Sequence, residues 1–535
     1  MTEKKWQIIN KFSADKLLEL LLENRGIKTQ KQKAEFLSPK HPEKITTTEA
    51  GISNNELKKA VTRVKIAIKK QEQIMVYGDY DADGICATAI VWEALDKLKA
   101  RATPFIPDRF EDGYGINTKS IENFKLQFPN IKLIITVDNG IVAYGALKEA
   151  KKLGIDVIIT DHHTFVKKPK AYAIVHTTQT SGSGVAWFFA KALGKKDSIE
   201  LAAIGTIADQ LPLLGVNRSI VKRGLENLSK TTRVGLRKLL MVAGLLNKEI
   251  GTYEVGFMIA PRINASGRIA QGMDALRLLC TKNPQRAEKL AILLNDLNRE
   301  RQELVEKATK LAETRSSQNS ESVIVIASEE YHEGIIGLIA GRLAEKNNRP
   351  AIVLSVSSKI AKASARSIAG FNIIEAIRSQ SELIIEGGGH EMAAGFSINV
   401  KNITDFSQKI NAYAHPLLTQ KVLDKKIKID TLLPFSEINQ KVYNTLEILE
   451  PYGIGNPAPV FATKGVKVLG QKTVGTNHLK LILGEDGHKI EAIYFNKPNK
   501  IAADKIDICY RLNKNVWNGN VKLELIIKDI HGAKV

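Results

Sequence analysis

The chain has 535 residues, too many for one ordinary hydrophobic core, and its apolar (44%) and charged (25%) fractions are typical of a soluble globular protein. Lys and Arg outnumber Asp and Glu by 78 to 57, a net charge of +21 that favours a nucleic-acid partner over the alternative of a generic solubility charge. Three widely spaced cysteines without a CxxC pair exclude a zinc ribbon and a disulfide framework, and no apolar run is long enough to span a membrane, so a reduced, cytoplasmic setting is expected.

Residues 1–55 are predicted to form a short helical leader, and the first ten residues lack the apolar core of a signal peptide. From residue 56 to 283, amphipathic helices alternate with short runs of Val and Ile. Such runs lie at residues 74–77, 133–137 and 157–160. This alternation is typical of a parallel sheet covered by helices on both faces, so an α/β domain is predicted.

The rest of the chain divides at changes in pattern. Residues 284–321 predict a long connecting helix with leucines at helical spacing, followed by a polar linker. A second α/β domain is predicted at 322–421, beginning with the Val/Ile run at 323–326. Residues 422–535 are rich in alternating strand patterns, with turn signals at 484–487 and 518–519, and predict a small β-barrel of OB type.

Acidic and imidazole side chains follow the predicted strands, at the end where open α/β sheets bind ligands. The residues concerned are Asp79, Asp81 and Asp83 after the first run, Asp138 after the second, Asp161, His162 and His163 after the third, and Asp209 after an apolar helix. Clustered carboxylates repel one another unless a cation lies between them, which indicates a metal site. Taken singly, each has a plainer explanation, namely a solvated turn, a helix cap or surface histidines.

Together and in this order, the motifs DxD, VDNG, DHH and GTIAD resemble the DHH phosphoesterase superfamily, over roughly residues 56–535. The resemblance implies two bound Mn²⁺ or Mg²⁺ ions, with Asp138 bridging them. It also assigns roles, residue by residue. The matching metal ligands are Asp81, Asp83, Asp138, His162 and Asp209, with Asp79 as a further ligand. The first five, together with His163, form the catalytic set; His163 stabilises charge on the phosphate, and Asp161 orients the ligands.

The resemblance is strongest to RecJ-type members of the superfamily. Many superfamily members carry a histidine where this chain has Tyr77, and RecJ-type members commonly lack it. The segment Leu449–Pro457 is similar to the RecJ lead-in to an OB domain. The domains implied are a DHH catalytic domain at 56–283, a DHH-associated substrate-binding domain at 322–421 and an OB-like nucleic-acid-binding domain at 422–535.

Several residues resemble the family's substrate contacts. They are Arg109 and Tyr114 in DRFEDGYG, Arg262 and Arg268 in PRINASGR, Arg366 and Ser367 in SARSI, and Gly388, Gly389 and His390 in GGGH. Arginine suits phosphate, and glycines let backbone amides approach an anion. The alternatives are a salt bridge from Arg109 to Glu111 or Asp112, core packing for the aromatic rings, and a tight turn for the glycine run.

The function implied is a 5′-to-3′ exonuclease specific for single-stranded DNA, which releases 5′-mononucleotides in DNA repair and recombination. A cleft between two α/β domains would admit one strand and exclude a duplex. Single-stranded DNA is the expected partner of a monomeric enzyme, with a single-strand-binding protein and a helicase as further candidates. The alternatives are a phosphodiesterase of short oligonucleotides or cyclic dinucleotides, and an inactive DNA-binding scaffold.

Overall fold

The computed structural model describes residues 4–113, 115–316, 321–475, 477–497, 500–517 and 520–532. The chain divides into two compact units. The smaller unit comprises residues 1–7 and 297–427, and the larger unit comprises residues 8–296 and 428–535. Within the ranges just given, no helix has both the length and the apolar character that crossing a bilayer requires.

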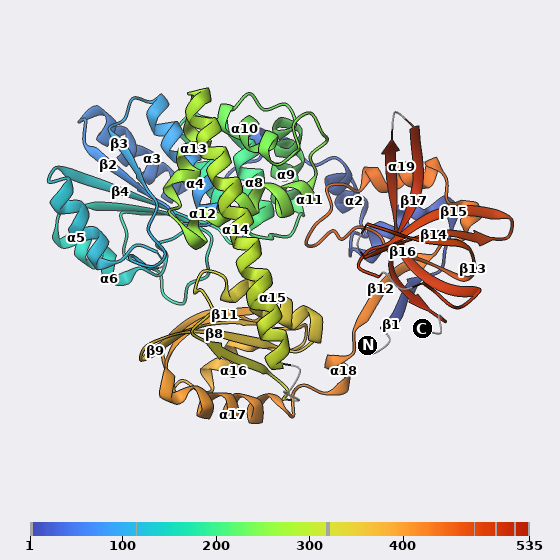
Figure 1. Ribbon diagram of the computed structural model, residues 1–535. Coiled ribbons are helices and arrows are strands. Elements are labelled where there is room, and N and C mark those ends of the chain that lie inside the picture. The colour runs from blue at the N-terminus through green and yellow to red at the C-terminus, as the bar shows by residue number, and fades with distance from the viewer. Residues whose placement is uncertain are drawn as a thin grey trace. The chain divides into compact units, whose positions relative to one another are not determined.

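A five-stranded parallel sheet forms the centre of the catalytic part of the larger unit (Figure 1), as the short Val/Ile runs predict. The strand order is β3-β2-β4-β5-β6, and every neighbouring pair is parallel. The strands are β2 (Gln73–Tyr77), β3 (Ala102–Phe105), β4 (Ile131–Val137), β5 (Asp156–Asp161) and β6 (Ala173–His176). Because the chain crosses over between parallel strands, all their carboxyl ends lie at one edge of the sheet.

Helices cover both faces of this sheet, which explains why its strands are apolar on both sides. On one face, α5 (Thr118–Gln127) and α6 (Tyr144–Lys152) pack their apolar residues on alternate strand residues such as Met75 and Ile159. On the other side, α4 (Ala82–Lys97) and α7 (Gly182–Ala192) contact β2, β4 and β5.

The remainder of the catalytic part is helical. Preceding the sheet is α3 (Asn54–Lys69), which begins with Ser53 as its N-cap. The later helices are α8 (Ile199–Ala208), α9 (Gly215–Leu228), α10 (Val234–Val242), α11 (Thr252–Glu254), the π-helical turn η3 (Val255–Ile259), α12 (Ala260–Ile269), α13 (Met273–Cys280) and α14 (Pro284–Ser316). The boundary between the two units falls within α14.

The smaller unit contains a second five-stranded sheet, with the order β10-β11-β9-β8-β7. Only β7 and β8 are parallel; the other pairs are antiparallel. Its elements are β7 (Ile324–Ser328), α15 (Ile336–Asn347), β8 (Ala351–Ser357), β9 (Ile360–Arg366), α16 (Ile373–Arg378), β10 (Ile384–His390), β11 (Ala393–Asn399), α17 (Ile403–Ala414) and α18 (Gln420–Leu423). Separate apolar cores fill the two faces of this sheet, so the predicted second α/β domain is confirmed.

The C-terminal strands close into a barrel. The order β13-β14-β15-β17-β16 is completed by an additional pairing of β13 with β16, which closes the five strands into a ring. These strands are β13 (Phe461–Val474), β14 (His478–Glu485), β15 (His488–Tyr494), β16 (Lys505–Trp517) and β17 (Asn520–His531). The predicted turn at 484–487 joins β14 to β15, whereas the turn predicted at 518–519 lies outside the described residues.

The first 55 residues do more than lead into the catalytic domain. Strand β1 (Lys5–Asn10) pairs with β12 (Lys426–Leu432), which in turn pairs with β13 of the barrel. Helix α1 (Leu17–Asn24) buries four leucines in the same core as barrel residues Phe461, Leu481 and Tyr510, while α2 (Gln30–Leu37) adds Phe36. The N-terminal segment therefore completes the core of the C-terminal domain.

The fully buried side chain of Arg218 in α9 joins three separate segments. Its guanidinium donates to the carbonyl of Phe36 (2.7 Å) and to those of Leu449 (3.1 Å), Glu450 (2.7 Å) and Pro451 (3.3 Å). Burial lowers the pKa of Arg218 to about 10, and the four carbonyls replace the water that a buried cation loses. This contact ties the lead-in to the barrel onto the helices of the catalytic part.

Candidate metal centre

The acidic loops meet at the carboxyl edge of the parallel sheet. Asp79 follows β2 directly, and Asp81 is the N-cap of α4, where its Oδ1 accepts from the amide of Gly84 at 2.9 Å. Asp83 follows in the first turn of the same helix and is buried. The strand-to-helix turn thus presents three carboxylates within five residues.

Asp83 also joins α4 to a second helix. Its two carboxylate oxygens accept from the backbone amides of Gly182 (2.7 Å) and Ser183 (3.0 Å), the first two residues of α7. The start of a helix carries unpaired amides and partial positive charge, so it stabilises a buried carboxylate. These two hydrogen bonds fix the position of the Asp83 carboxylate against the N-terminus of α7.

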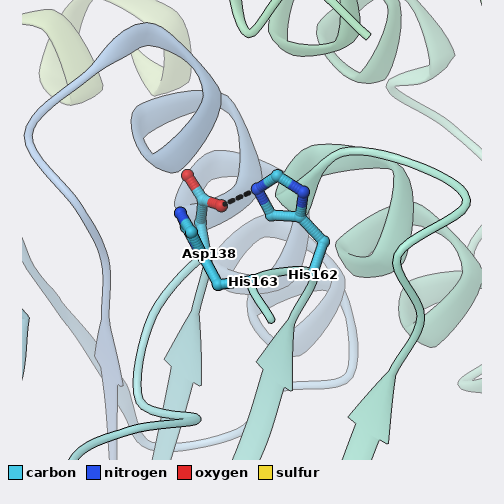
Figure 2. A group of neighbouring side chains, drawn as sticks. All are labelled: Asp138, His162 and His163. Atoms are coloured by element: carbon cyan, nitrogen blue, oxygen red, sulfur yellow. Dashed lines mark ion pairs between the residues drawn. The ribbon is translucent and has the colours of Figure 1, made fainter. Parts of the chain in front are cut away.

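Asp138 lies at the end of β4 in a conformation unusual for a residue with a side chain, with φ of +62°. Its carboxylate is buried, and its Oδ1 has no hydrogen-bond donor among the described residues. That oxygen lies 3.2 Å from Nε2 of His162, as Figure 2 shows. A buried, unsatisfied carboxylate in a strained backbone is costly, and a cation would remove that cost.

The two histidines after β5 have different electrostatic environments. Nδ1 of His163 lies 2.8 Å from Oδ1 of Asp161. Burial alone would lower the pKa of His163, but its hydrogen bond to Asp161 outweighs burial and raises that pKa to about 9. Burial lowers the pKa of His162. At neutral pH His163 is therefore a cation, while His162 is neutral and can ligate a metal.

Asp209 stands at the C-terminus of α8, where the helix dipole disfavours a negative charge. Its Oδ2 lies 3.5 Å from Nε2 of His162. Burial, together with the neighbouring Asp83 and Asp81, raises the pKa of Asp209 to about 8. A cation is the remaining way to keep this carboxylate ionised at neutral pH.

The ligand atoms form three sets, and within each set they lie within 4.8 Å of one another. Asp79, Asp81 and Asp138 form the first set, and Asp83, His162 and Asp209 form the second. Asp138, His162 and His163 form a third set, which shares a residue with each of the other two. Burial and neighbouring carboxylates raise the pKa values of Asp79, Asp81 and Asp138. Oxygen-rich sets with one imidazole suit Mn²⁺ and Mg²⁺, so the residues present fit two such ions, with Asp138 and His162 where the sets meet.

Gly182 is as necessary to this geometry as the ligands, because a Cβ atom there would lie 2.1 Å from Oδ1 of Asp138. We expect Gly182→Ala to displace Asp138 and to reduce metal-dependent turnover by about 10²-fold, the usual effect of a 1 Å misplacement. Gly341→Ala is the matched control, since a Cβ there meets nothing within 4 Å. Turnover and Mn²⁺ affinity measured for both variants would check this, and a fully active Gly182→Ala would contradict it.

Two of the predicted phosphate-binding arginines lie near the carboxylates. Arg109 stands over the ring of Tyr80 at 5.1 Å, and its charge partly offsets the rise that burial causes in the pKa of Asp79, while Arg268 acts in the same way on Asp81. Within the described residues, neither Glu111 nor Asp112 forms an ion pair with Arg109, and the carboxylate of Asp112 accepts from the amide of Asp108. Tyr114 lies outside the described residues.

Arg262 is already engaged within the helical region. Its guanidinium donates to the side chain of Asn295 at 3.2 Å and to the carbonyl of Met258 at 2.6 Å. The same segment supplies a contact that the sequence analysis missed, because Oδ1 of Asn264 accepts from the amide of Ala82 at 2.8 Å and so fixes the loop of Asp81 and Asp83. The predicted DNA contact of Arg262 stays a prediction.

In the smaller unit, the glycine run forms part of the exposed edge strand β10, so the alternative of a tight turn is wrong. His390 pairs with Ala393 of β11, which pairs with Arg366 of β9, so these residues lie across three adjacent strands. A Cβ at Gly388 would meet nothing within 4 Å, which leaves its backbone open to a ligand. The buried Ser367 hydroxyl instead donates to the carbonyl of Phe371 at 2.6 Å.

Gly182, Ser183 and Asn264 are the contacts that sequence reasoning missed. A signal was present for the first two, since the segment Ser181-Gly182-Ser183-Gly184 before an apolar run is a helix start, and Ser181 accepts from the amide of Gly184. Nothing in the sequence indicates that this helix start faces Asp83. That contact links residues about one hundred positions apart.

Three family models match separate segments of the chain. The family model described as the DHH family, N-terminal domain, matches residues 73–210. The DHHA1 domain matches residues 320–415, and the RecJ OB domain matches residues 429–529. The first match contains every predicted metal ligand.

Several whole proteins similar to this chain are described as single-stranded-DNA-specific exonucleases. The single-stranded-DNA-specific exonuclease RecJ of Bacillus subtilis is 36% identical over 536 residues, which cover 96% of this chain and 67% of that protein. The crystal structure of RecJ in complex with Mn²⁺ from Thermus thermophilus matches with a TM-score of 0.85 at 30% identity, covering 99% of this chain and 80% of that one. The same enzyme in complex with Mg²⁺ matches with a TM-score of 0.77 at 28% identity, covering 99% and 79%.

Proposed function

This chain belongs to the RecJ family of single-stranded-DNA-specific exonucleases, and on that premise we propose that its ligand sets hold two Mn²⁺ or Mg²⁺ ions that hydrolyse phosphodiester bonds. The observation that carries the proposal is that six residues converge in overlapping sets of ligand atoms, namely Asp79, Asp81, Asp83, Asp138, His162 and Asp209. Such an enzyme is a metal-dependent exodeoxyribonuclease.

The bound ions would supply Lewis-acid stabilisation of the attacking and leaving oxygens. The chain's own residues provide the rest. Asp138 joins the first and second ligand sets through its contact with His162. His163, kept protonated by Asp161, places a positive charge beside the ligands and can stabilise a non-bridging phosphate oxygen. Arg109 and Arg268 add positive charge near Asp79 and Asp81.

The proposed substrate is single-stranded DNA, degraded from the 5′ end to 5′-mononucleotides, and the proposed setting is DNA repair and recombination. A net charge of +21 and a closed OB-type barrel support a nucleic-acid strand as the ligand. Arg109 is proposed to bind the terminal 5′ phosphate. In the smaller unit, Arg366 and the open backbone at Gly388, with the neighbouring Gly389 and His390, are proposed to bind phosphates of the strand.

The alternative of a phosphodiesterase for short oligonucleotides is less well supported, because the chain continues into an OB domain beyond the DHHA1 match. The alternative of an inactive scaffold is less well supported because every ligand is present and in place. We further infer a monomeric enzyme in the cytoplasm, where its three cysteines stay reduced, with a single-strand-binding protein and a helicase supplying the strand.

End-labelled digestion tests this proposal. With Mn²⁺ or Mg²⁺, we expect a 5′-labelled single strand to release labelled mononucleotide from the start, while a 3′-labelled strand shortens progressively. A blunt duplex is the substrate control and EDTA is the metal control, and neither is expected to give product. Release of the 3′ label first, equal digestion of the duplex or activity in EDTA would each contradict the proposal.

A further inference from the structure

Two loops beside the metal ligands carry exposed apolar side chains. Their exposed fractions are high for large apolar residues, and Val166 projects fully into solvent. The four residues, called the apolar rim below, are Val142 (52% exposed), Tyr144 (42%), Phe165 (37%) and Val166 (105%). Val142 comes four residues after Asp138 and Phe165 three residues after His162, so the rim extends directly from the two central ligand loops.

The rim is held firmly against these loops. The hydroxyl of Tyr144 donates to the carbonyl of Lys167 at 2.7 Å, which links the loop after β4 to the loop after β5. The ring of Phe165 meets the ring of His176 edge to face, with centroids 5.2 Å apart. In turn Nε2 of His176 lies 2.8 Å from the carbonyl of His163. The rim therefore keeps a defined position relative to His162 and His163.

The order of strands places Phe165 and Val166 of the rim across the metal ligands from Arg109, while Val142 and Tyr144 follow the same strand as Asp138. Along the edge of the sheet the order is β3, β2, β4 and β5. Arg109 follows β3, the acidic turn follows β2, Asp138 follows β4, and Phe165 follows β5 beyond His162. Three strand spacings separate β3 from β5, about 14 Å in all.

We propose that the apolar rim is the surface on which the base immediately 3′ of the scissile phosphate stacks. The inference rests on the proposed function, in which Arg109 binds the terminal phosphate and the ligand sets bind the scissile one. The next nucleotide then lies on the β5 side, at the rim. An aromatic ring accepts any base, as a nuclease without sequence preference requires.

The charges around the rim also favour a nucleic-acid strand. Lys167 and Lys170 are exposed on the same loop, and Lys168 forms an ion pair with Glu56 at 3.4 Å. An apolar surface flanked by lysines is suited to a base with its phosphates. The alternative occupant of the rim is another protein, and kinetics of rim variants on defined strands distinguish a stacked base from a bound protein.

The test combines rim variants with a strand that lacks the second base from the 5′ end. For Phe165→Ala with Val166→Ser we expect KM on an unmodified strand to rise about tenfold, the lower part of the range for one stacked base, with little change in kcat. On the strand with an abasic second nucleotide, the variant and the wild type are expected to be equal. An abasic site at the tenth nucleotide is the matched substrate control and should leave the tenfold difference intact.

Two further variants separate stacking from disturbance of the ligand loop. Phe165→Leu keeps apolar bulk without a flat ring and should fall between the wild type and the alanine variant. Leu126→Ala removes a side chain of 78% exposure on α5 and should behave as wild type. Equal losses on both strands, or a fall in kcat with weaker Mn²⁺ binding, would overturn the proposal in favour of a structural role.

The remaining outcomes are equally decisive. Unchanged KM for the rim variants in the purified enzyme overturns the proposal and leaves a protein partner as the occupant. Turnover of the unmodified strand by the wild-type enzyme tests the proposed exonuclease function independently of the rim. An inactive wild type would overturn both inferences, whereas an active wild type with unaffected rim variants would overturn the rim alone.

Discussion

Asp138→Asn is expected to lower kcat on single-stranded DNA by at least about 10³-fold, equivalent to about 4 kcal/mol of transition-state stabilisation. Asp138 belongs to the ligand set of Asp79 and Asp81 and also to that of His162 and His163, and it lies 3.2 Å from His162, so its carboxylate serves both sets. Asparagine fits the same space and tolerates the φ of +62° at this position, so the fold should be preserved. Only the charge that holds the cations is removed.

The measurements for this variant are turnover of a 5′-labelled strand, strand affinity by fluorescence anisotropy and Mn²⁺ binding by calorimetry. Strand affinity should change little, because Arg109, Arg268 and the basic surface remain. Asp197→Asn, at an exposed carboxylate paired with Lys97, is the control and should keep full activity. Turnover within tenfold of wild type would remove Asp138 from its bridging role.

Arg218→Ala is expected to destabilise the larger unit by about 3–5 kcal/mol. The substitution removes four hydrogen bonds to backbone carbonyls, of which those of Leu449 and Pro451 keep Asn456 as a donor. It also opens a cavity beside Phe36, over whose ring the guanidinium lies at 3.7 Å. Arg218→Lys should recover only part of this loss, since an ammonium group has three donors and lacks the planar fork.

Thermal unfolding followed by circular dichroism would measure this effect. The midpoint temperature of the first unfolding transition should fall by several degrees. Arg223→Ala is the control on the same helix, because that exposed side chain pairs with the exposed Glu226 at 2.8 Å and should matter little. Turnover per folded molecule should be unchanged at low temperature. A melting curve identical to that of wild type would show that the four hydrogen bonds contribute little.

Much of the fold could be predicted because apolar runs and helices alternate with a regular period. The runs at residues 74–77, 133–137 and 157–160 became the three central strands of the parallel sheet. The acidic residues after these runs necessarily meet at one edge, since parallel strands end on the same side. The proximity of Asp79, Asp138 and His162 therefore followed from local pattern plus topology.

What could not be predicted depends on contacts between distant segments. The packing of α1 in the barrel core has no local signal, because its leucines only indicate an apolar face and not its partner. The same holds for the amides of Gly182 and Ser183 at Asp83, and for Asn264 at Ala82. The glycine run was interpreted as a turn or a phosphate loop, yet β-sheet pairing placed it in an edge strand.

The shared core of the first and last segments has a consequence for biosynthesis. Asn24, at the end of α1, is hydrogen-bonded to Asp430, which the ribosome adds 406 residues later. Until the barrel strands emerge, the leucines of α1 stay uncovered, and the sheet and helices between them can fold first. We therefore expect the nascent chain to expose an apolar helix, α1, for most of its translation. A premature stop before residue 461, where the barrel strands begin, should yield a product that aggregates although its parallel sheet is folded.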